Sequence, residues 1–375
     1  MLNPKTEKDL QDAIASAKAP LRVMGGGTRP IGKPLTGEVL STAGLSGITL
    51  YEPGSLTIVA QAGTPLSEVE AALAADKQRL PFEPMDHRKL LGTSGEPTIG
   101  GVVATNASGP RRIQVGAARD SLIGVRFVDG QGTAIKNGGR VMKNVTGYDL
   151  VKLLAGSWGT LGVLSEVSFK VLPDVDTRVS VMLDGLSDAQ AVEAMCAALG
   201  SPFEVTGAAH LPQGHDGQPL TLLRLEGFSE SVAYRMAQLE KLLSPYGTAR
   251  VETDGEKVKT IWRALRDVED FADRAGDVWR ISVKPTDGPA IAARITGDVI
   301  YDWGGGLIWA LVAEGTDLRA ALGDFAGHAS LIRASQEHRA QLPVFQPEPA
   351  PLAKITQGLR EKFDPRGILN PGLMG

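Results

Sequence analysis

The residues of this chain that best indicate a binding site are glycines gathered in short loops, with threonine, asparagine and arginine beside them. The first loop reads Gly25-Gly26-Gly27-Thr28-Arg29 and follows an apolar run at residues 21–24. A second series, at residues 92–109, reads GTSGEPTIGGVVATNASG. Glycine has no side chain, so backbone N–H groups in such loops can approach a bound anion closely. Several of these loops between short apolar strands predict a cradle for a phosphate-bearing cofactor.

Two common phosphate-binding motifs do not fit the first loop. A dinucleotide fingerprint would need a further glycine where the chain has Pro30. A P-loop would need a Ser or Thr hydroxyl for magnesium after Lys33, where the chain has Pro34. The remaining interpretation is a tight turn whose N–H groups, from Gly25 to Thr28, bind a diphosphate. A plain strand-to-helix turn is the alternative.

Further segments carry candidate cofactor-binding residues. The segment KNVTGYDL concentrates hydrogen-bond donors, acceptors and a flexible glycine within a short stretch. Alternatives remain open, since Asn106 could be an ordinary turn residue, Arg119-Asp120 a solvated ion pair and Val163 a core residue. The candidates beyond the first loop are Gly95, Thr98, Ile99, Gly100, Gly101, Asn106, Ser108, Gly109, Arg119, Asp120, Lys143, Asn144, Thr146, Gly147, Asp149, Gly162 and Val163.

Taken in this order, the loops resemble the flavin domain of the vanillyl-alcohol-oxidase, or PCMH-type, FAD enzymes. The resemblance is dense over residues 1–173. It is lighter at the carboxyl end, where Asn370-Pro371-Gly372 is similar to the tail that returns to the flavin domain in this superfamily. Within the superfamily, the chain resembles the FAD-binding E subunits of bacterial glycolate oxidase complexes.

The resemblance implies FAD as the cofactor and a role for each segment. It places the first loop and the turn at residues 100–101 against the pyrophosphate. It places the pair at residues 119–120 near the ribityl or adenosine portion, and the main chain of Val163 at the adenine. Covalent relatives have a histidine just after the first glycine turn, where this chain has Thr28, so non-covalent binding is expected.

The same resemblance implies a subunit of an FAD-dependent oxidoreductase that oxidises glycolate to glyoxylate. Its implied partners are a homologous FAD-linked catalytic D subunit and an iron–sulfur F subunit. Related 2-hydroxy-acid dehydrogenases carry the signature HxGDGNxH, whereas this chain has Gly214-His215-Asp216-Gly217 without the Asn or a second His nearby. No catalytic residue is therefore assigned. A free-standing hydroxy-acid or sugar-lactone oxidoreductase and a scaffold with structural FAD are the alternatives.

Charge and composition exclude several functions. The formal net charge of −4 offers no basic field for nucleic acid. Cys196 is the only cysteine, so an iron–sulfur cluster must be held by a partner. His210 and His215 are expected in a solvated loop with too few ligands for a metal. No apolar run predicts a transmembrane segment, and the charged N-terminus indicates a cytoplasmic protein. The resemblance allows peripheral association with the inner membrane through partner subunits.

The pattern of apolar residues predicts an α+β fold in two domains. Thr6 and Asp9 predict a capping box, and residues 66–73 predict a helix. Strands are expected at 21–24, 56–63, 162–173, 178–183, 203–208, 221–226, 279–283 and 307–312, a hairpin at 121–136, and helices at 187–199 and 229–243. The expected organisation is a two-subdomain FAD-binding domain at 1–173, a smaller α+β cap at 174–345, and a returning C-terminal segment at 346–375. Trp262, Trp279, Trp303 and Trp309 are expected in the core, with a substrate face as the alternative.

Overall fold

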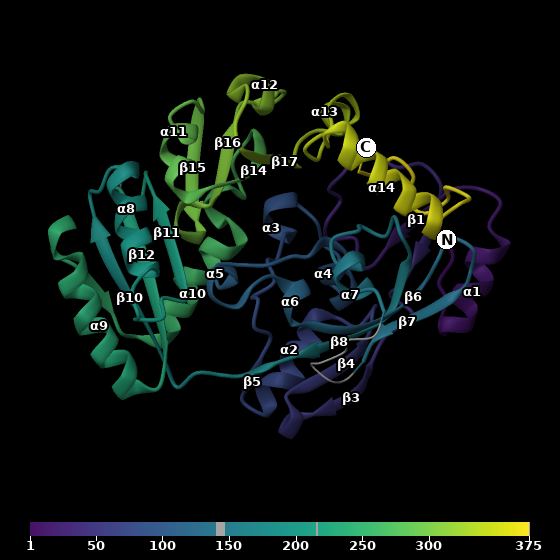
Figure 1. The fold of residues 1–375 in the computed structure, drawn as a ribbon, viewed down its shortest axis with the longest axis horizontal. Coiled ribbons are helices and arrows are strands. Elements are labelled where there is room, and N and C mark those ends of the chain that lie inside the picture. Colours follow the sequence, from purple (N-terminus) through teal and green to yellow (C-terminus); the bar gives the residue numbers. More distant parts are fainter. Residues whose placement is uncertain (140–146, 215–216, 375) are drawn as a thin grey trace. The chain divides into compact units, whose positions relative to one another are not determined.

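The computed structural model describes residues 1–139, 147–214 and 217–374, which form two compact units (Figure 1). The first unit comprises Met1–Ser108, Gly116–Asp174 and Pro347–Gly375, and the second comprises Gly109–Val115 and Val175–Gln346. The chain thus leaves the first unit twice, once for a short segment and once for a long one. Each unit combines helices with sheet, which confirms the predicted α+β class.

The first unit is built on a five-stranded sheet with the order β3-β4-β8-β6-β7. All of its neighbouring strands are antiparallel, whereas β1 and β2 form a separate parallel pair. The strands of the first unit are β1 Leu21–Met24, β2 Glu38–Ser41, β3 Ile48–Glu52, β4 Thr57–Gln61, β5 Gln78–Arg79, β6 Leu122–Val128, β7 Ala134–Gly138, β8 Val163–Lys170 and β9 Leu172–Pro173. Its helices are α1 Glu7–Ser16, α2 Leu66–Ala75, α3 Arg88–Leu91, α4 Ile99–Thr105, α6 Ala118–Ser121, α7 Leu150–Leu154 and α14 Ala350–Phe363.

Apolar side chains from the sheet and the helices form the core of this unit. Phe169 of β8 packs with residues such as Leu73 of α2 and Val102 of α4. Burial of each such side chain stabilises the fold by about 1.5–3 kcal/mol. The predicted capping box is confirmed, because the Thr6 hydroxyl accepts from the Asp9 N–H and the Asp9 carboxylate accepts from the Thr6 N–H.

The second unit contains one eight-stranded sheet with the order β13-β10-β12-β11-β15-β16-β14-β17. Its strands are β10 Thr177–Asp184, β11 Gly207–Leu211, β12 Leu220–Gly227, β13 Arg250–Glu252, β14 Asp277–Val283, β15 Gly297–Asp302, β16 Leu307–Val312 and β17 Gly327–Arg333. Its helices are α5 Arg112–Val115, α8 Asp188–Leu199, α9 Ser229–Leu243, α10 Gly255–Asp267, α11 Gly288–Ala292, α12 Leu318–Leu322 and α13 Gln336–Gln341. The expected core positions of Trp262, Trp279, Trp303 and Trp309 are confirmed by their burial.

Two sequence-based predictions in the second unit are wrong. The strand expected at residues 203–208 is β11, and it begins only at Gly207 because Glu204 has a left-handed backbone (φ +51°) that an extended strand cannot contain. His210 does not lie in a solvated loop, since it is a fully buried residue of β11. His215 lies outside the described residues.

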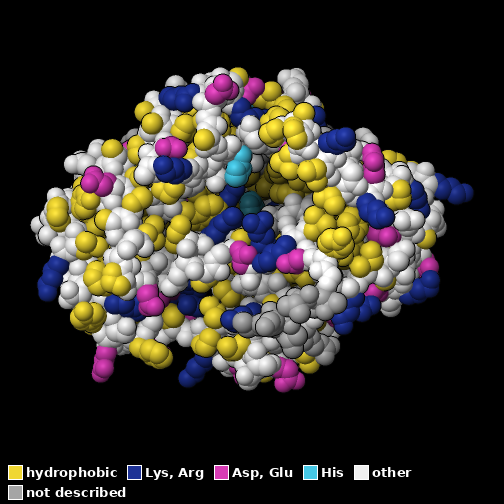
Figure 2. All heavy atoms as spheres, in the orientation of Figure 1, with side chains coloured by type: hydrophobic (Ala, Val, Ile, Leu, Met, Phe, Trp, Pro, Cys, Tyr) yellow, Lys and Arg dark blue, Asp and Glu magenta, His cyan; other side chains and the backbone are white. Residues whose placement is uncertain are grey.

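The surface of the protein carries charges of both signs. Basic and acidic side chains are interspersed over much of the face drawn in Figure 2. No helix in the described ranges is long and apolar enough to cross a membrane.

Candidate cofactor site

The first glycine loop follows the end of β1, and its backbone N–H groups are the donors that it could offer to a ligand. In the described part of the chain, no group accepts a hydrogen bond from the N–H of Gly25, Gly26, Gly27 or Thr28. Thr28 is nevertheless buried, with 4% of its surface exposed. Buried or partly buried N–H groups are nearly always paired in folded proteins. A run of unpaired donors in a glycine turn is therefore suited to an anionic ligand that supplies the acceptors.

The first loop packs backbone to backbone against the second glycine series. A Cβ added to Gly26 would lie 1.6 Å from the Glu96 carbonyl oxygen, and one added to Gly95 would lie 1.7 Å from the Gly26 carbonyl oxygen. Any side chain at either position would collide with fixed backbone. The structure thus brings together two loops that are far apart in sequence, and it explains why both contain glycine.

The turn at residues 98–101 completes this wall of the site. Thr98 caps α4, because its hydroxyl accepts from the Gly101 N–H at 3.3 Å. The Gly100 N–H donates to the Ala62 carbonyl at 2.8 Å, and Ile99 donates in the same way to Thr64 at 3.0 Å. These bonds fix the turn on the loop that follows β4.

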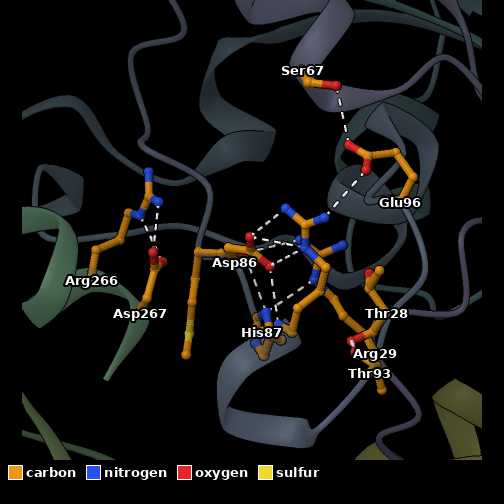
Figure 3. A network of polar contacts seen from close by, with 11 residues as sticks. Thr28, Arg29, Ser67, Asp86, His87, Thr93, Glu96, Arg266 and Asp267 are labelled. Atoms are coloured by element: carbon orange, nitrogen blue, oxygen red, sulfur yellow. Dashed lines mark hydrogen bonds and ion pairs between the residues drawn. The ribbon is translucent and has the colours of Figure 1, made fainter. Parts of the chain in front are cut away.

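Arg29 lies beside Gly101 and is anchored by the segment that precedes α3. A Cβ added to Gly101 would lie 3.6 Å from Arg29 Nη1. Arg29 Nε donates to His87 Nδ1 at 3.1 Å, and Nη2 donates to the Met85 carbonyl at 3.0 Å (Figure 3). The guanidinium therefore adds a fixed positive charge next to the glycine turns.

A second set of polar contacts connects the same segment to Glu96. Arg88 forms an ion pair with Asp86 at 2.8 Å and another with Glu96 at 3.2 Å. The Ser67 hydroxyl donates to the other oxygen of Glu96 at 3.1 Å (Figure 3). The sequence analysis did not find His87 or Arg88, because their segment has no glycine pattern and their partners are distant in sequence.

Asn106 and Ser108 bind the loop that contains Arg119 and Asp120. The Asn106 side-chain oxygen accepts from the Arg119 N–H at 3.0 Å, and the Ser108 hydroxyl accepts from the Ala118 N–H at 2.9 Å. Asp120 pairs with Lys152 at 2.9 Å. Burial opposes ionisation of Asp120, but the bonds from Lys152 and Ala117 outweigh it and lower the pKa of the carboxyl group. The side chains of Asn106, Ser108 and Asp120 thus hold this loop in place through hydrogen bonds and an ion pair.

The remaining candidates occupy different places. Lys143, Asn144 and Thr146 lie outside the described residues. Gly147 is exposed, and Asp149 caps α7 by accepting from the Lys152 N–H at 3.1 Å. Gly162 and Val163 are buried, and a Cβ on Gly162 would lie 2.5 Å from the Phe127 ring. Gly109 belongs to the second unit, where its carbonyl accepts from Trp303 Nε1 at 3.1 Å.

The C-terminal tail holds the strand that leads into the first loop. The Asn370 side-chain oxygen accepts from the Val23 N–H at 2.7 Å, and its amide nitrogen donates to the Trp158 carbonyl at 2.8 Å. Asn370 is 3% exposed, and Leu369 forms a parallel bridge with Leu21 of β1. The tail therefore fixes β1 and the loop around Trp158 at the same point.

Other titratable side chains of the second unit form hydrogen bonds with one another or with neighbouring polar side chains. His210 Nδ1 lies 2.9 Å from the Thr221 hydroxyl, and the Tyr301 hydroxyl donates to Asp188 at 2.6 Å. Burial raises the pKa of Cys196, which makes it a poor nucleophile. No group of acidic, histidine or cysteine residues within the described ranges could hold a metal ion.

Comparisons with known proteins show the family to which this chain is related. The family model described as "FAD binding domain" matches residues 1–138. Glycolate oxidase subunit GlcE of Escherichia coli (strain K12) is 35% identical over 363 residues, which are 96% of this chain and 93% of that protein. Glycolate oxidase subunit GlcD of Bacillus subtilis (strain 168) is 32% identical over 167 residues, which are 44% of this chain and 34% of that protein.

The fold is also found in a solved structure. Alkyldihydroxyacetonephosphate synthase superposes with a TM-score of 0.70 at 16% sequence identity, covering 98% of this chain and 76% of that chain. Together these matches confirm the prediction of a PCMH-type FAD-binding fold followed by an α+β cap, and the prediction of FAD as cofactor. The relatives are FAD-linked oxidoreductases, as the sequence analysis expected. The chain belongs to the family of the glycolate oxidase subunit GlcE.

Proposed function

We propose that this chain is the FAD-binding subunit of a complex that oxidises glycolate to glyoxylate. The observation that carries the proposal is its similarity to GlcE over nearly the whole length of both proteins. The unpaired N–H groups at residues 25–28 support it, because they offer the donors that the FAD diphosphate requires.

The residues of the first unit would bind and orient the cofactor. Gly25 to Thr28 would donate their N–H groups to the diphosphate, and the Arg29 guanidinium would add positive charge beside it. His87 holds Arg29 through a hydrogen bond to Arg29 Nε, so the guanidinium needs little reorganisation when the anion binds. Bound FAD would supply the acceptor for the two electrons of the alcohol oxidation, and the protein supplies the binding and the electrostatic environment.

We assign to the other predicted binding residues the roles that the resemblance implies. Thr98, Ile99, Gly100 and Gly101 would form the opposite side of the diphosphate site. Those at residues 106–109, 119–120, 143–149 and 162–163 would contact the remaining parts of FAD. The domain limits at residues 173 and 345 are likewise part of this proposal.

The complex would contain a homologous FAD-linked D subunit and an iron–sulfur F subunit. The similarity to GlcD supports a homologous partner. Cys196 is the only cysteine of the chain, so the cluster would be held by the F subunit. We place the complex in the cytoplasm, where partner subunits would bring it to the inner membrane.

The purified chain is expected to be yellow and to release its FAD on acid precipitation. Thr28 occupies the position at which covalent relatives have a histidine, so the flavin is held only by non-covalent contacts. The absorbance of the supernatant and of the pellet measures this directly. Colour that stays in the pellet would contradict non-covalent binding, and a colourless chain that takes up no added FAD would contradict the proposed function.

A further inference from the structure

A cluster of cationic side chains surrounds Trp303 in the second unit. The Arg112 guanidinium carbon lies 4.6 Å from the centre of the Trp303 ring, and that of Arg280 lies 5.0 Å from it. The indole is 7% exposed, and its Nε1 donates to the Gly109 carbonyl. This bond ties the short segment that contains Arg112 to the turn between β15 and β16. Trp303 has a left-handed backbone (φ +54°), which a bulky residue rarely adopts.

His328 belongs to the same cluster by the register of the sheet. Arg280 of β14 pairs with Ser330 of β17, and Ser282 pairs with His328. Residues that pair across antiparallel strands, and residues two apart on one strand, point to the same face. Arg280 and His328 are therefore diagonal neighbours on one face, at the distance that long side chains can bridge.

The cluster has more positive than negative charge. Burial and the charge of Arg112 lower the pKa of Arg280 to about 10, against the opposing effect of Asp302. Partial desolvation and the charges of Arg280 and Arg112 lower the pKa of His328. Like charges that lower each other's pKa values lie close together.

Unlike the buried Arg111 and Arg235 of this unit, Arg280 forms no ion pair with an acidic side chain in the part of the chain that the structure describes. Arg111 binds Glu226 through two bonds of 3.0 and 2.6 Å, and Arg235 pairs with Glu204 at 3.0 Å. Within the described ranges, the Arg280 guanidinium makes no hydrogen bond or ion pair, and its one ring contact is with Trp303. A half-buried guanidinium without an acceptor is costly unless a ligand supplies one.

We propose that Arg280, Arg112 and His328 form a binding site for the carboxylate of a small 2-hydroxy acid, so that this chain itself holds the acid. A guanidinium fork matches the two oxygens of a carboxylate, and His328 is exposed and can donate a further hydrogen bond. The choice of a hydroxy acid rests on the proposed function. Trp303 positions both guanidiniums, because it stacks with each of them.

The test is calorimetric titration of the FAD-loaded chain with oxalate, a carboxylate analogue of the substrate. Oxalate is expected to bind, whereas glycolamide, which has the shape of glycolate but no charge, is not. Arg280→Met is expected to weaken oxalate binding by about tenfold or more, since hydrogen bonds between charged groups contribute about 1.5–3 kcal/mol. Arg250→Met is the matched control, because Arg250 forms an exposed ion pair with Asp184 elsewhere in this unit.

Several outcomes would contradict the proposed carboxylate-binding site. Unchanged oxalate affinity in Arg280→Met, or glycolamide binding as tight as oxalate binding, would contradict it. Inorganic phosphate that binds more tightly than oxalate and depends on Arg280 would contradict the assignment to a carboxylate. If Arg280→Met does not fold, Arg280→Lys keeps the charge but loses the fork, and unchanged affinity in that variant would also contradict the site.

The FAD content of each sample separates this inference from the proposed function. The flavin absorbance of Arg280→Met is expected to equal that of the wild type, because the candidate cofactor residues around Gly25 belong to the first unit. Full FAD content without oxalate binding would overturn the carboxylate site alone. Oxalate binding by a chain that cannot take up FAD would overturn the proposed function and leave the anion site supported.

Discussion

Gly101→Val is expected to weaken FAD binding strongly while leaving the protein folded. A Cβ at this position would meet the Thr98 hydroxyl at 3.2 Å and Arg29 Nη1 at 3.6 Å, which are both side-chain atoms, so a small shift of Thr98 would accommodate it without displacing backbone. Valine also has a better helix propensity than glycine, and residue 101 lies in α4. The added methyl groups would occupy the space next to the Arg29 guanidinium, where we place the diphosphate. FAD affinity should fall by about tenfold or more, because a charged hydrogen bond contributes about 1.5–3 kcal/mol.

Fluorescence titration of the apoprotein with FAD measures this loss. Gly54→Val is the matched control, since a Cβ at Gly54 meets no atom within 4 Å and residue 54 is not part of the candidate site. Both variants are expected to show wild-type circular dichroism. Full FAD affinity in a folded Gly101→Val protein would mean that the turn at residues 98–101 does not face the cofactor.

Glu226→Gln is expected to destabilise the second unit by about 3–5 kcal/mol, the usual effect of removing one partner of a buried ion pair. Glu226 is 1% exposed at its side chain and accepts both bonds of Arg111, which is 3% exposed. Arg178 and Arg224 lie 3.4 and 3.6 Å from the same carboxylate. Without that carboxylate, the positive charges of guanidinium groups that are mostly buried would remain close together with no negative charge to neutralise them.

Denaturant unfolding followed by tryptophan fluorescence measures this destabilisation, because Trp262 stacks with Arg224 in the same unit. Asp184→Asn is the control, since its ion pair with Arg250 is exposed and contributes only about 0–1 kcal/mol. Equal unfolding midpoints for the two variants would contradict the role of Glu226. Because Arg111 is adjacent to Arg112, Glu226→Gln should also weaken oxalate binding.

The features predicted correctly from sequence are those encoded by nearby residues. The capping box of Thr6 and Asp9 needs only a spacing of three residues, and the helices that begin near Ser187 and Ser229 follow from apolar periodicity. The glycine loops, taken together and in order, predicted an FAD-binding fold through their resemblance to a known family. The family match confirms that prediction.

The features that the sequence did not reveal depend on contacts between distant residues. His87, for example, holds Arg29 across 58 positions of the sequence. The strand expected from Phe203 begins later because the left-handed backbone of Glu204 has no signal in apolar alternation. The Arg280 site is assembled from α5, β14 and β17, so no local pattern could have indicated it.

The most direct test of the proposed function is glycolate-dependent reduction of an artificial electron acceptor by the reconstituted complex. The chain is coexpressed with its D and F partners, and the purified complex is assayed with the wild-type chain, with Gly101→Val, and without the chain. We predict turnover only with the wild-type chain, with little or none by that chain alone. Equal turnover in the absence of this chain would contradict its role in the complex, and rapid glycolate oxidation by the isolated chain would show instead a free-standing enzyme.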